Sequence, residues 1–313
     1  MKDRNWIRSK IKTLYEKNEA GCIAFVPGKG HTLIPLSREK PALPQIDQKC
    51  AVTYTLSGGR LGDNLLSYLH AKWIAHQYQI PLIQVPFPRC EEFSLSLIPQ
   101  PAVINSPVET IPYFPEPSMK NNHPPFFVDW DDHDFRQEIA ACLKPTRAHA
   151  LLKLPSDRIT VCVHIRRGGS FDSPFLSLEY PLKFPPDSYY LQQIETVAHI
   201  FQGQPLYLFL MTDDLHPEKT MALYRKTIPN PNIEWDCRKT PPSDDLDDFF
   251  SIPLFDCLIH PDSNFSIVAS KLTEYAIKIH PTHYKKKKEK ALITGVKISF
   301  NPEYRLYPNK MKS

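Results

Sequence analysis

The segment at residues 159–169, ITVCVHIRRGG, joins a hydrophobic run to a cluster of polar and flexible residues. Its first half is apolar and largely β-branched, which predicts a buried strand of a parallel sheet. His164, Arg166, Arg167 and two glycines come next, so the polar groups lie where this strand ends. Ligands of open α/β sheets bind outside the carboxyl ends of the strands. Because the planar fork of arginine matches phosphate oxygens, the segment predicts a phosphate-bearing ligand at this point.

The length and composition indicate a globular protein of about two domains. The chain has 313 residues and is 42% hydrophobic, which is enough to bury a sizeable core. Its formal net charge of +4 is too small to argue for a nucleic-acid-binding protein. We expect a boundary near residue 150, between an N-terminal domain of residues 1–150 and a C-terminal domain of residues 151–313. Many of the 32 prolines cluster at 81–125 and 174–186, which predicts long ordered loops there.

The cysteines and the hydropathy pattern indicate in which cellular compartment the protein is expected. The seven cysteines are scattered, odd in number and without a C-x-x-C pair, which is typical of reduced thiols in a cytosolic protein. No apolar run approaches the ~18 residues of a membrane span. The charged N-terminus lacks the apolar core of a signal peptide. We therefore expect a cytoplasmic protein.

Two segments are candidates for peripheral contact with a membrane. Residues 3–18 have the spacing of an amphipathic helix, which is expected to pack on its own domain. Residues 285–290, KKKKEK, are expected to form a solvated loop. The alternative for both is a membrane surface, and for the lysine run it is any polyanion.

Strand and helix patterns alternate along the chain. Short apolar runs predict strands at 51–56, 81–85, 126–130, 159–165, 206–211, near Ile233 and at 257–260. Helical spacing predicts helices at 3–18, after the glycine turn at 57–64, and at 133–153, 187–201, 217–226, 244–255 and from the turn at 261–266 to about Ile277. Residues 27–48 are expected to be an extended connection, and most of 86–130 to be loops. The alternation indicates an α/β fold with a parallel, Rossmann-like sheet.

Three predicted strand ends in the second half carry polar groups, and in one parallel sheet all three point to the same edge. They are His164 with Arg166 and Arg167, then Thr212 with Asp213 and Asp214, then Ser263 with Asn264 and Ser266. The last group opens a helix, whose free N–H groups and hydroxyls can hold a phosphate. Four acids at 244–248 also begin a helix, where acids are stabilising without any functional role. One of these carboxylates could instead accept hydrogen bonds from a guanine.

A glycine turn at residues 57–64, SGGRLGDN, connects a predicted strand to a predicted helix. Such a turn exposes backbone N–H groups to an anion or a polar ligand. Many α/β proteins use glycine there only to pack the helix against the strand. The turn alone does not decide between the two.

These segments together resemble a known family, the GDP-fucose-dependent fucosyltransferases of the bacterial alpha-1,2 family, which are related to alpha-1,6 and protein O-fucosyltransferases. HIRRGG at 164–169 resembles the family's His-x-Arg-Arg-Gly-Asp motif, and DSYYLQQI at 187–194 resembles its Tyr-Tyr helix start. FLMTDD at 209–214 resembles its strand ending in Thr/Ser-Asp-Asp, and SNFS at 263–266 its Ser-Ser-Phe-Ser turn. GGRLGDNLLSY at 58–68 resembles its N-terminal Gly-Gly-Leu-Gly-Asn-Gln-Leu-Phe-x-Tyr block.

The resemblance implies an α/β, GT-B-like fold, in which two Rossmann-like domains face a cleft. The donor, GDP-fucose, would bind the C-terminal domain, and a glycan acceptor the N-terminal one, for glycan biosynthesis without a metal or other cofactor. By the same likeness Arg166 binds the β-phosphate, and Asp248 and His164 face the guanine. The implied donor contacts are completed by Arg167, Ser263, Asn264, Phe265 and Ser266. The implied cleft-lining residues of the other domain are Gly58, Gly59, Gly62 and Asn64.

The resemblance also implies an inverting transfer that needs no metal, because an arginine and helix N–H groups can stabilise the departing diphosphate. A carboxylate base is then expected to activate the acceptor hydroxyl, and Asp172 and Glu179 are the candidates. The chain departs from the family at Gly169, which replaces an aspartate, and at Arg60, which is inserted in the glycine turn. Another GDP-sugar, a non-catalytic nucleotide- or glycan-binding protein, and an unrelated α/β protein with a basic tail are the alternatives.

Overall fold

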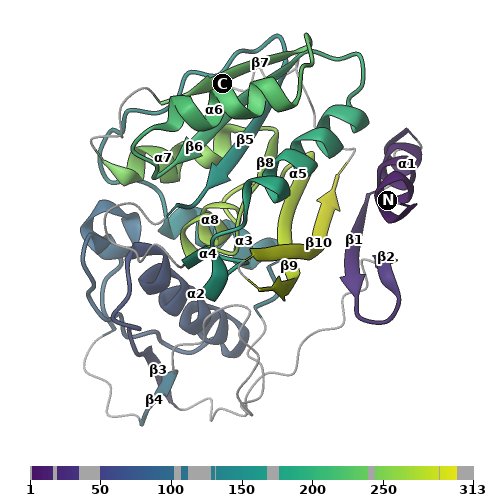
Figure 1. Cartoon of the computed structure of the whole chain (residues 1–313). Helices are drawn as coiled ribbons and strands as arrows, with labels where there is room; N and C mark the ends of the chain where they lie inside the picture. Colours follow the sequence, from purple (N-terminus) through teal and green to yellow (C-terminus); the bar gives the residue numbers. More distant parts are fainter. Residues whose placement is uncertain are drawn as a thin grey trace. The chain divides into compact units, whose positions relative to one another are not determined.

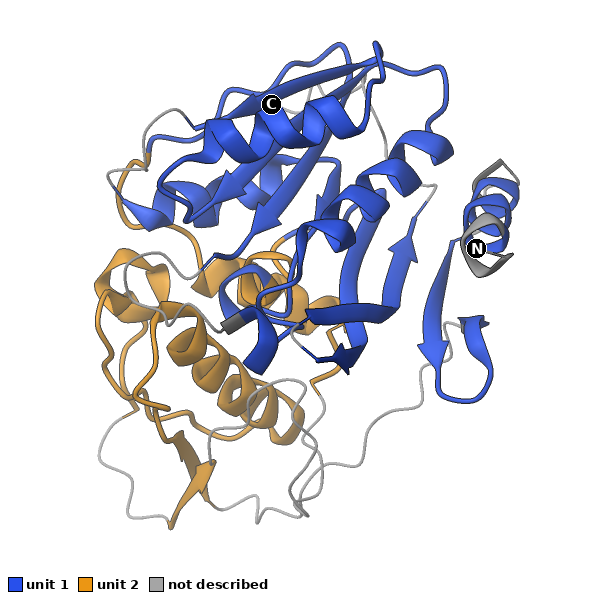
Figure 2. Ribbon diagram, in the orientation of Figure 1, with its two compact units in different colours: residues 1–37, 150–266, 273–313 blue, residues 38–149, 267–272 orange. Residues whose placement is uncertain are grey.

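The computed structural model describes residues 2–16, 20–34, 50–101, 107–111, 128–130, 132–167, 176–238, 244–288 and 290–301. The chain forms two compact units, shown in different colours in Figure 2. The larger unit comprises residues 1–37, 150–266 and 273–313, and the smaller unit comprises residues 38–149 and 267–272. The expected boundary near residue 150 coincides with one of these divisions. The assignment of residues 1–37 to the N-terminal domain does not agree with them.

An eight-stranded sheet organises the larger unit, in the order β2-β1-β10-β9-β8-β5-β6-β7 (Figure 1). Its parallel part consists of β5 (Ile159–Ile165), β6 (Leu206–Thr212), β7 (Ile233–Cys237), β8 (Cys257–Ile259) and β9 (Ile277–Lys287). The antiparallel part adds β10 (Lys290–Phe300), β1 (Gly21–Val26) and β2 (Gly30–Ile34). The predicted α/β class with a parallel, Rossmann-like sheet is confirmed.

Burial explains why the central strand could be recognised from sequence. All seven residues of β5 are buried, as expected for a parallel strand covered on both faces. The helices between the parallel strands include α5 (Asp187–Ile200), α6 (Pro217–Thr227) and α7 (Asp245–Ser251), which is followed by the short turn η4 (Ile252–Leu254). Apolar residues of α5 and α6, such as Tyr190, Ile194 and Tyr224, join β5 and β6 in one hydrophobic core.

The region after β8 differs from its prediction. The helix expected to reach Ile277 is α8 (Asn264–Ala269), and Ile277 is instead the first residue of β9. Residues 285–290 were expected to be a solvated loop, but the described ones, 285–288 and 290, lie at the end of a long hairpin of β9 and β10. The alternation of buried and less buried residues at the start of β9 is the period-two pattern of a strand. Pairing with β8 on one side and β10 on the other then fixes this conformation.

The N-terminal residues belong to the larger unit for a physical reason. The predicted helix is present as α1 (Lys2–Glu16), and Ile7, Ile11 and Leu14 are buried in the core of that unit. The guanidinium of Arg8 lies 3.0 Å from the carboxylate of Glu195 on α5. After α1, the hairpin of β1 and β2 replaces the first part of the expected extended connection, and β1 pairs with β10. Residues 35–49 lie outside the described part of the chain.

The smaller unit contains a two-stranded parallel sheet of β3 (Ala51–Tyr54) and β4 (Val108–Ile111). Its helices are α2 (Leu61–Tyr78) and α3 (His133–Cys142), with short turns η1 (Cys90–Glu92) and η2 (Ser94–Leu97). The strand predicted at 81–85 is reduced to one bridge between Leu82 and Val52. Helix α3 ends eleven residues before the predicted end, because Pro145 disfavours helical backbone in the residue before it. Of the strand predicted at 126–130, only residues 128–130 are described, and they are not in a strand.

None of the helices in the described residues has the length and apolar character needed to cross a membrane.

Candidate functional site

The carboxyl ends of β5, β6 and β8 meet at one edge of the sheet in the larger unit. The strand register pairs Ile165 with Thr212, so the segments that leave β5 and β6 begin side by side. The Nη1 atom of Arg166 lies 3.1 Å from Oδ2 of Asp213, and the backbone N–H of Arg167 donates to Oδ1 of the same carboxylate at 2.5 Å. Asp213 therefore joins the two predicted strand ends. Only 14% of the Arg166 side chain is exposed, so its charge is held close to the sheet edge.

His164 points to the same group of residues through an aromatic contact. Its ring stacks on Phe265 with a centroid separation of 5.8 Å and an interplanar angle of 27°. Burial lowers the pKa of His164 to about 4, although the charge of Asp213 opposes this shift. The imidazole is therefore neutral near pH 7. Its Nδ1 atom is buried and has no hydrogen-bond partner among the described residues, which is unusual for a buried polar atom.

Phe265 also contacts α7, which brings the predicted guanine-binding acid to the same edge. The rings of Phe265 and Phe249 are 5.4 Å apart in an edge-to-face arrangement, and Asp248 is the residue before Phe249. One contact chain therefore runs from His164 through Phe265 to Phe249, the residue that follows Asp248 on α7. The structure thus groups residues from β5, α7 and the start of α8 that are up to about 100 positions apart in the chain.

The acids at 244–248 have different partners. Asp244 accepts a hydrogen bond from the backbone N–H of Leu246 and so caps α7, and Asp247 accepts from the backbone N–H of Ala150 at 2.9 Å. Asp248 instead faces Arg238, whose Nε lies 2.5 Å from its Oδ1. Burial raises the pKa of Asp248 to about 6, against the lowering effect of Arg238. Helix capping and a backbone contact explain Asp244 and Asp247, whereas the buried Asp248 has a side chain as its partner.

Arg238 was not predicted as a site residue. It follows β7 at a strand end, but a single arginine in the sequence carries no pattern that distinguishes it from a surface residue. Its partner lies ten positions further along, across residues 239–243, which are outside the described residues. A search for charged residues just after each parallel strand would have found it.

Arg167 has a structural environment. Its guanidinium is paired with the carboxylate of Asp187 at the start of α5. The hydroxyl of Tyr224 donates to the same carboxylate oxygen at 2.6 Å. Asp187 thus ties the end of β5 to α5 and α6. The predicted donor contact of Arg167 stays a prediction, and the geometry gives this residue a role in holding the sheet edge together.

The turn before α8 is stabilised mostly from within. Ser263 and Ser266 are both buried, and Oγ of Ser266 donates to the carbonyl of Ser263 at 3.1 Å. Oγ of Ser266 also lies 3.5 Å from Nδ1 of His260. The hydroxyl of Ser266 therefore stabilises the turn. Asn264 is half-buried at the first position of α8, and Phe265 makes the ring contacts described above.

Of the two candidates for a catalytic base, only Glu179 lies in the described part of the chain. Asp172, like Gly168 and Gly169, lies outside the described residues. Glu179 is exposed at the end of the short helix α4 (Leu176–Glu179). The described part of the chain has no group of three or more histidine, cysteine and acidic side chains that could hold a metal ion.

In the smaller unit, side chains of the glycine turn before α2 accept hydrogen bonds from the turn's own backbone. The carboxylate of Asp63 accepts from the backbone N–H of Arg60 at 3.1 Å, and Oγ of Ser57 accepts from the backbone N–H of Gly59 at 3.0 Å. A side chain at position 59 would collide with Asp63, and Gly58 has a positive φ of 73°. Glycine is therefore required by the backbone and by the cap of α2. This geometry favours the packing interpretation over an anion site.

Two other residues named for this turn are inside the smaller unit's core. Gly62 is buried in the first turn of α2, and Asn64 is 4% exposed. The amide of Asn64 donates to the carbonyl of Gly59 at 3.4 Å. Their predicted role in lining a cleft stays a prediction.

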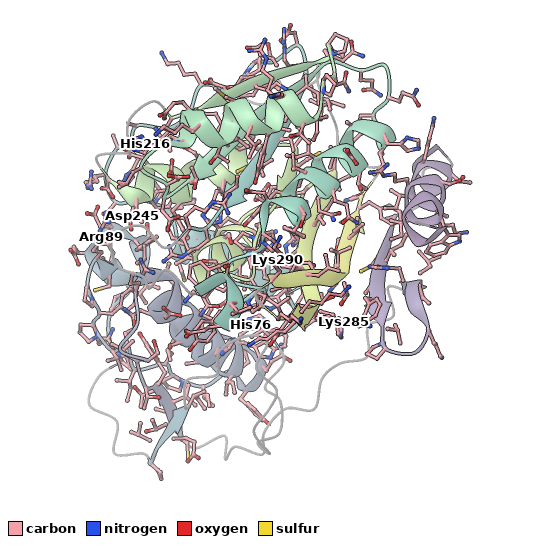
Figure 3. The ribbon with its side chains drawn as sticks, in the orientation of Figure 1. His76, Arg89, His216, Asp245, Lys285 and Lys290 are labelled. Carbon is pink, nitrogen blue, oxygen red and sulfur yellow. The ribbon has the colours of Figure 1, made fainter. Side chains whose placement is uncertain are left out.

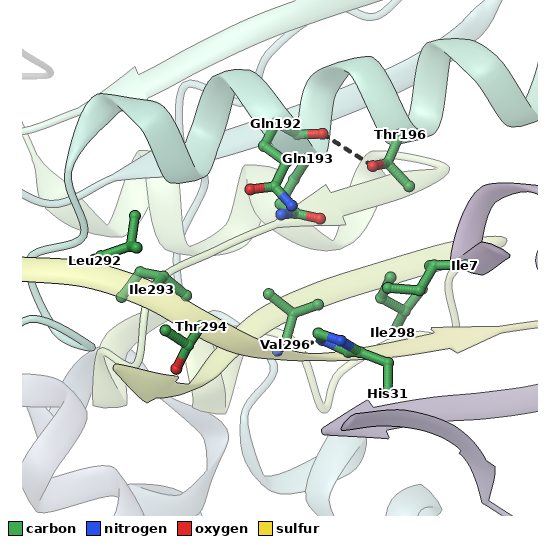
Figure 4. Close-up of a pocket in the computed structure, with 10 residues that line it drawn as sticks. All are labelled: Ile7, His31, Gln192, Gln193, Thr196, Leu292, Ile293, Thr294, Val296 and Ile298. Carbon is green, nitrogen blue, oxygen red and sulfur yellow. Dashed lines mark hydrogen bonds between the residues drawn. The ribbon is translucent and has the colours of Figure 1, made fainter. Parts of the chain in front are cut away.

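A cavity of about 210 Å³ lies elsewhere in the larger unit. Figure 4 shows Gln192, Gln193 and Thr196 of α5 on one side of it and Val296 and Ile298 of β10 on the other. It includes none of the predicted site residues. We place the candidate site at the sheet edge because the charged and aromatic contacts converge there, whereas this cavity has mainly apolar and neutral walls.

No family model matches the chain, and no curated protein matches it. The chain is similar to solved structures of NodZ. A structure of NodZ alpha-1,6-fucosyltransferase soaked with GDP-fucose aligns at 15% identity and a TM-score of 0.38, over 80% of this chain and 99% of that chain. One co-crystallized with GDP aligns at 16% identity and a TM-score of 0.38, over 76% and 96%. Fucosyltransferase NodZ from Bradyrhizobium aligns at 15% identity and a TM-score of 0.37, over 75% and 96%.

Proposed function

We propose that the chain is a glycosyltransferase that moves fucose from GDP-fucose to a glycan hydroxyl. The observation that carries the proposal is the contact chain at the sheet edge, with Arg166 and His164 at one end and Asp248 at the other. A cation that can hold a phosphate and a buried acid that can hold a base are the two requirements for a nucleoside diphosphate. Their place at the carboxyl ends of parallel strands is the usual place for a nucleotide.

The donor would use three described side chains. Arg166 would bind the β-phosphate, with Asp213 fixing the position of its guanidinium. Asp248 would accept the N1–H and 2-amino hydrogens of guanine, a pairing that adenine and uracil do not offer. His164 is neutral, and its buried Nδ1 would gain a hydrogen bond from the nucleotide. Arg238 would hold the carboxylate of Asp248 in place.

The transfer step is proposed to be inverting and independent of a metal. As the sugar leaves, negative charge grows on the β-phosphate, and the fixed cation of Arg166 would stabilise it. The acceptor hydroxyl would attack the anomeric carbon from the opposite face and lose its proton to a carboxylate, either Asp172 or Glu179. The acceptor would be a glycan. The same site would also admit another GDP-sugar, because the contacts named above involve GDP rather than the sugar.

A second candidate is a non-catalytic nucleotide- or glycan-binding protein of the same fold. The observation that favours it is the pairing of Arg166 with Asp213 and of Arg167 with Asp187. Both arginines have local acids as partners, as they would if they only held the sheet edge together. A ligand would then have to compete with Asp213 for Arg166.

Calorimetry with GDP, GDP-fucose, GDP-mannose and UDP tests the donor site. We expect binding of the guanine nucleotides and not of UDP, and a loss of about tenfold or more in GDP affinity for Arg166→Ala. The control is Arg158→Ala, an ion-paired arginine next to the opposite end of β5, which should leave GDP affinity unchanged. Unchanged GDP affinity in Arg166→Ala would refute the phosphate role.

A transfer assay separates the two candidates. Fucose transfer to a glycan supports the enzyme, whereas GDP-fucose binding without transfer or hydrolysis supports the non-catalytic protein. Tight binding of a UDP-sugar with no GDP-sugar binding would contradict both the donor assignment and the role of Asp248. A requirement for Mn²⁺ would contradict the metal-independent mechanism.

A further inference from the structure

The hairpin of β9 and β10 extends beyond the strands that flank it. Strand β8 pairs with β9 only through Ile277–Ile279, and β1 pairs with β10 only from Lys297 to Phe300. Further along the hairpin, residues 280–287 and 290–296 have ladder pairing only with each other among the described strands. We call residues 284–288 and 290–292 at its end the lysine arm. The arm is held by its own ladder and most of its side chains are exposed, while Leu292, with the neighbouring Ile293, also lines the cavity beside α5 (Figure 4).

The lysine-rich segment at residues 285–290 has a net charge equal to that of the whole chain. Lys285, Lys286, Lys287, Lys288 and Lys290 are all exposed, and none has an ion pair with a described residue. Figure 3 labels two of them, Lys285 on β9 and Lys290 on β10. If these five lysines and the one glutamate between them are set aside, the 38 basic and 34 acidic residues of the chain become 33 of each. The net charge of +4 is therefore the charge of residues 285–290.

Two exposed apolar side chains accompany the lysines. Tyr284 is 38% exposed and Leu292 is 41% exposed. The register pairs Lys285 with Leu292 and Tyr284 with Ile293. Because paired residues lie on the same face of a ladder, one face carries Lys285 beside Leu292. The other carries Tyr284 beside the partly buried Ile293. Each face therefore combines an apolar side chain with lysines close by along the strands.

We propose that the lysine arm docks the protein on a membrane surface rich in anionic lipids. Lysine clusters are attracted to the negative surface potential of such a membrane, and the attraction falls off within a Debye length. Tyr284 supplies the amphipathic ring that is enriched at the level of the headgroups, and Leu292 supplies aliphatic contact. A nucleic acid would use the lysines and could stack on Tyr284, but it offers little to Leu292. The membrane therefore accounts for more of the arm than a nucleic acid does.

Co-sedimentation of the full chain with vesicles tests the proposal. One set of vesicles is phosphatidylcholine alone, and the other contains about a quarter phosphatidylserine. We expect binding to the second set only, with loss of binding as salt is raised towards ~1 M, where the Debye length falls to ~3 Å. Replacing the five lysines of the arm by glutamine should lower the partition coefficient by at least about tenfold.

The matched control changes the same charge at other exposed places. Lys29, Lys144, Lys153, Lys219 and Lys226 are exposed outside the arm, and replacing all five by glutamine should leave vesicle binding intact. The double variant Tyr284→Ser/Leu292→Ser, which keeps every lysine, should bind anionic vesicles several-fold more weakly than the wild type. Circular dichroism of each variant checks that it is folded.

Three outcomes would overturn the proposal. The first is wild-type binding to anionic vesicles that does not exceed binding to phosphatidylcholine. The second is equal loss of vesicle binding in the five-lysine variant and in its control, since the effect would then be one of overall charge. The third is tight binding to single-stranded RNA that survives in the Tyr284→Ser/Leu292→Ser variant, together with absent vesicle binding. That result would assign the arm to nucleic acid.

Discussion

Asp248 gives a prediction that can be worked through from the structure. Its side chain is 12% exposed, and its Oδ1 lies 2.5 Å from Nε of Arg238. Burial raises the pKa of Asp248 from 3.8 to about 6, because the low-polarity surroundings disfavour the carboxylate more than Arg238 favours it. The folded protein therefore holds a proton on Asp248 at pH values where the unfolded chain has released it. Replacing Asp248 by asparagine removes this proton from both states.

The sign and size of the effect follow from linkage. A carboxyl group whose pKa is raised on folding stabilises the folded state fully below pH ~4, and this contribution is lost as the pH rises to ~6. A shift of about two units corresponds to at most about 3 kcal/mol at 1.36 kcal/mol per unit, and about 1–3 kcal/mol after allowance for residual solvent screening. As the pH rises from ~4 to ~6, the free energy of unfolding of the wild type should therefore fall by this amount relative to that of Asp248→Asn. The lost contact with Arg238 adds an offset that is the same at every pH above this range.

Urea unfolding of both proteins at a series of pH values measures the difference. Asp245→Asn, at an exposed position of the same helix, controls for the loss of one negative charge from α7. A difference between wild type and Asp248→Asn that stays constant from pH ~4 to ~7 would refute the reasoning, because burial would then not perturb this carboxyl group. If Asp248 binds guanine as proposed, GDP affinity of the wild type should also fall as the pH is lowered through ~6, and Asp248→Asn should bind weakly throughout.

Two further predictions concern stability. Thr160→Val removes a buried hydroxyl that donates to Oδ2 of Asp256 at 2.9 Å and accepts from the backbone N–H of Asp256 at 3.0 Å. The free energy of unfolding in urea should therefore fall by about 2–3 kcal/mol. An unchanged urea midpoint would contradict this prediction. Asp63→Ala removes the cap of α2 and should cost about 0.5–2 kcal/mol in thermal or urea unfolding, whereas Glu218→Ala in the first turn of α6, which contributes no cap hydrogen bond, should cost less.

The parallel core was predictable because its signals are local. The run from Ile159 to Ile165 is apolar throughout, and β5 has the predicted bounds. The strands and helices that follow, from α5 to β8, also lie close to their predicted positions, because each has a pattern of apolar residues that extends over its own length. The polar strand ends of β5 and β6 could be placed together from topology alone, and the contact of Arg166 with Asp213 agrees with that placement.

Other features depend on contacts that no local pattern encodes. The sequence does not show that Arg238 pairs with Asp248, because several other acids lie close to Asp248 in the chain. The lysine-rich end of the β9–β10 hairpin has low strand propensity, and its ladder is imposed by the apolar half of the same strands. Residues 21–34 could have been recognised, because the apolar run before Pro27 and Gly28 is typical of a hairpin.

The joining of β1 to β10 has a consequence for how the protein is made. Cys22 and Ser299 are neighbours in the sheet but are 277 positions apart in the chain. During synthesis, β1 and β2 therefore emerge long before the strand that receives them. Until β10 arrives, this hairpin has an unpaired edge and buried-type side chains such as Ile23 exposed to other chains. Contacts between such distant segments slow folding, so the larger unit completes its sheet only after Phe300 has been made, and until then the edge of the hairpin is open to aggregation.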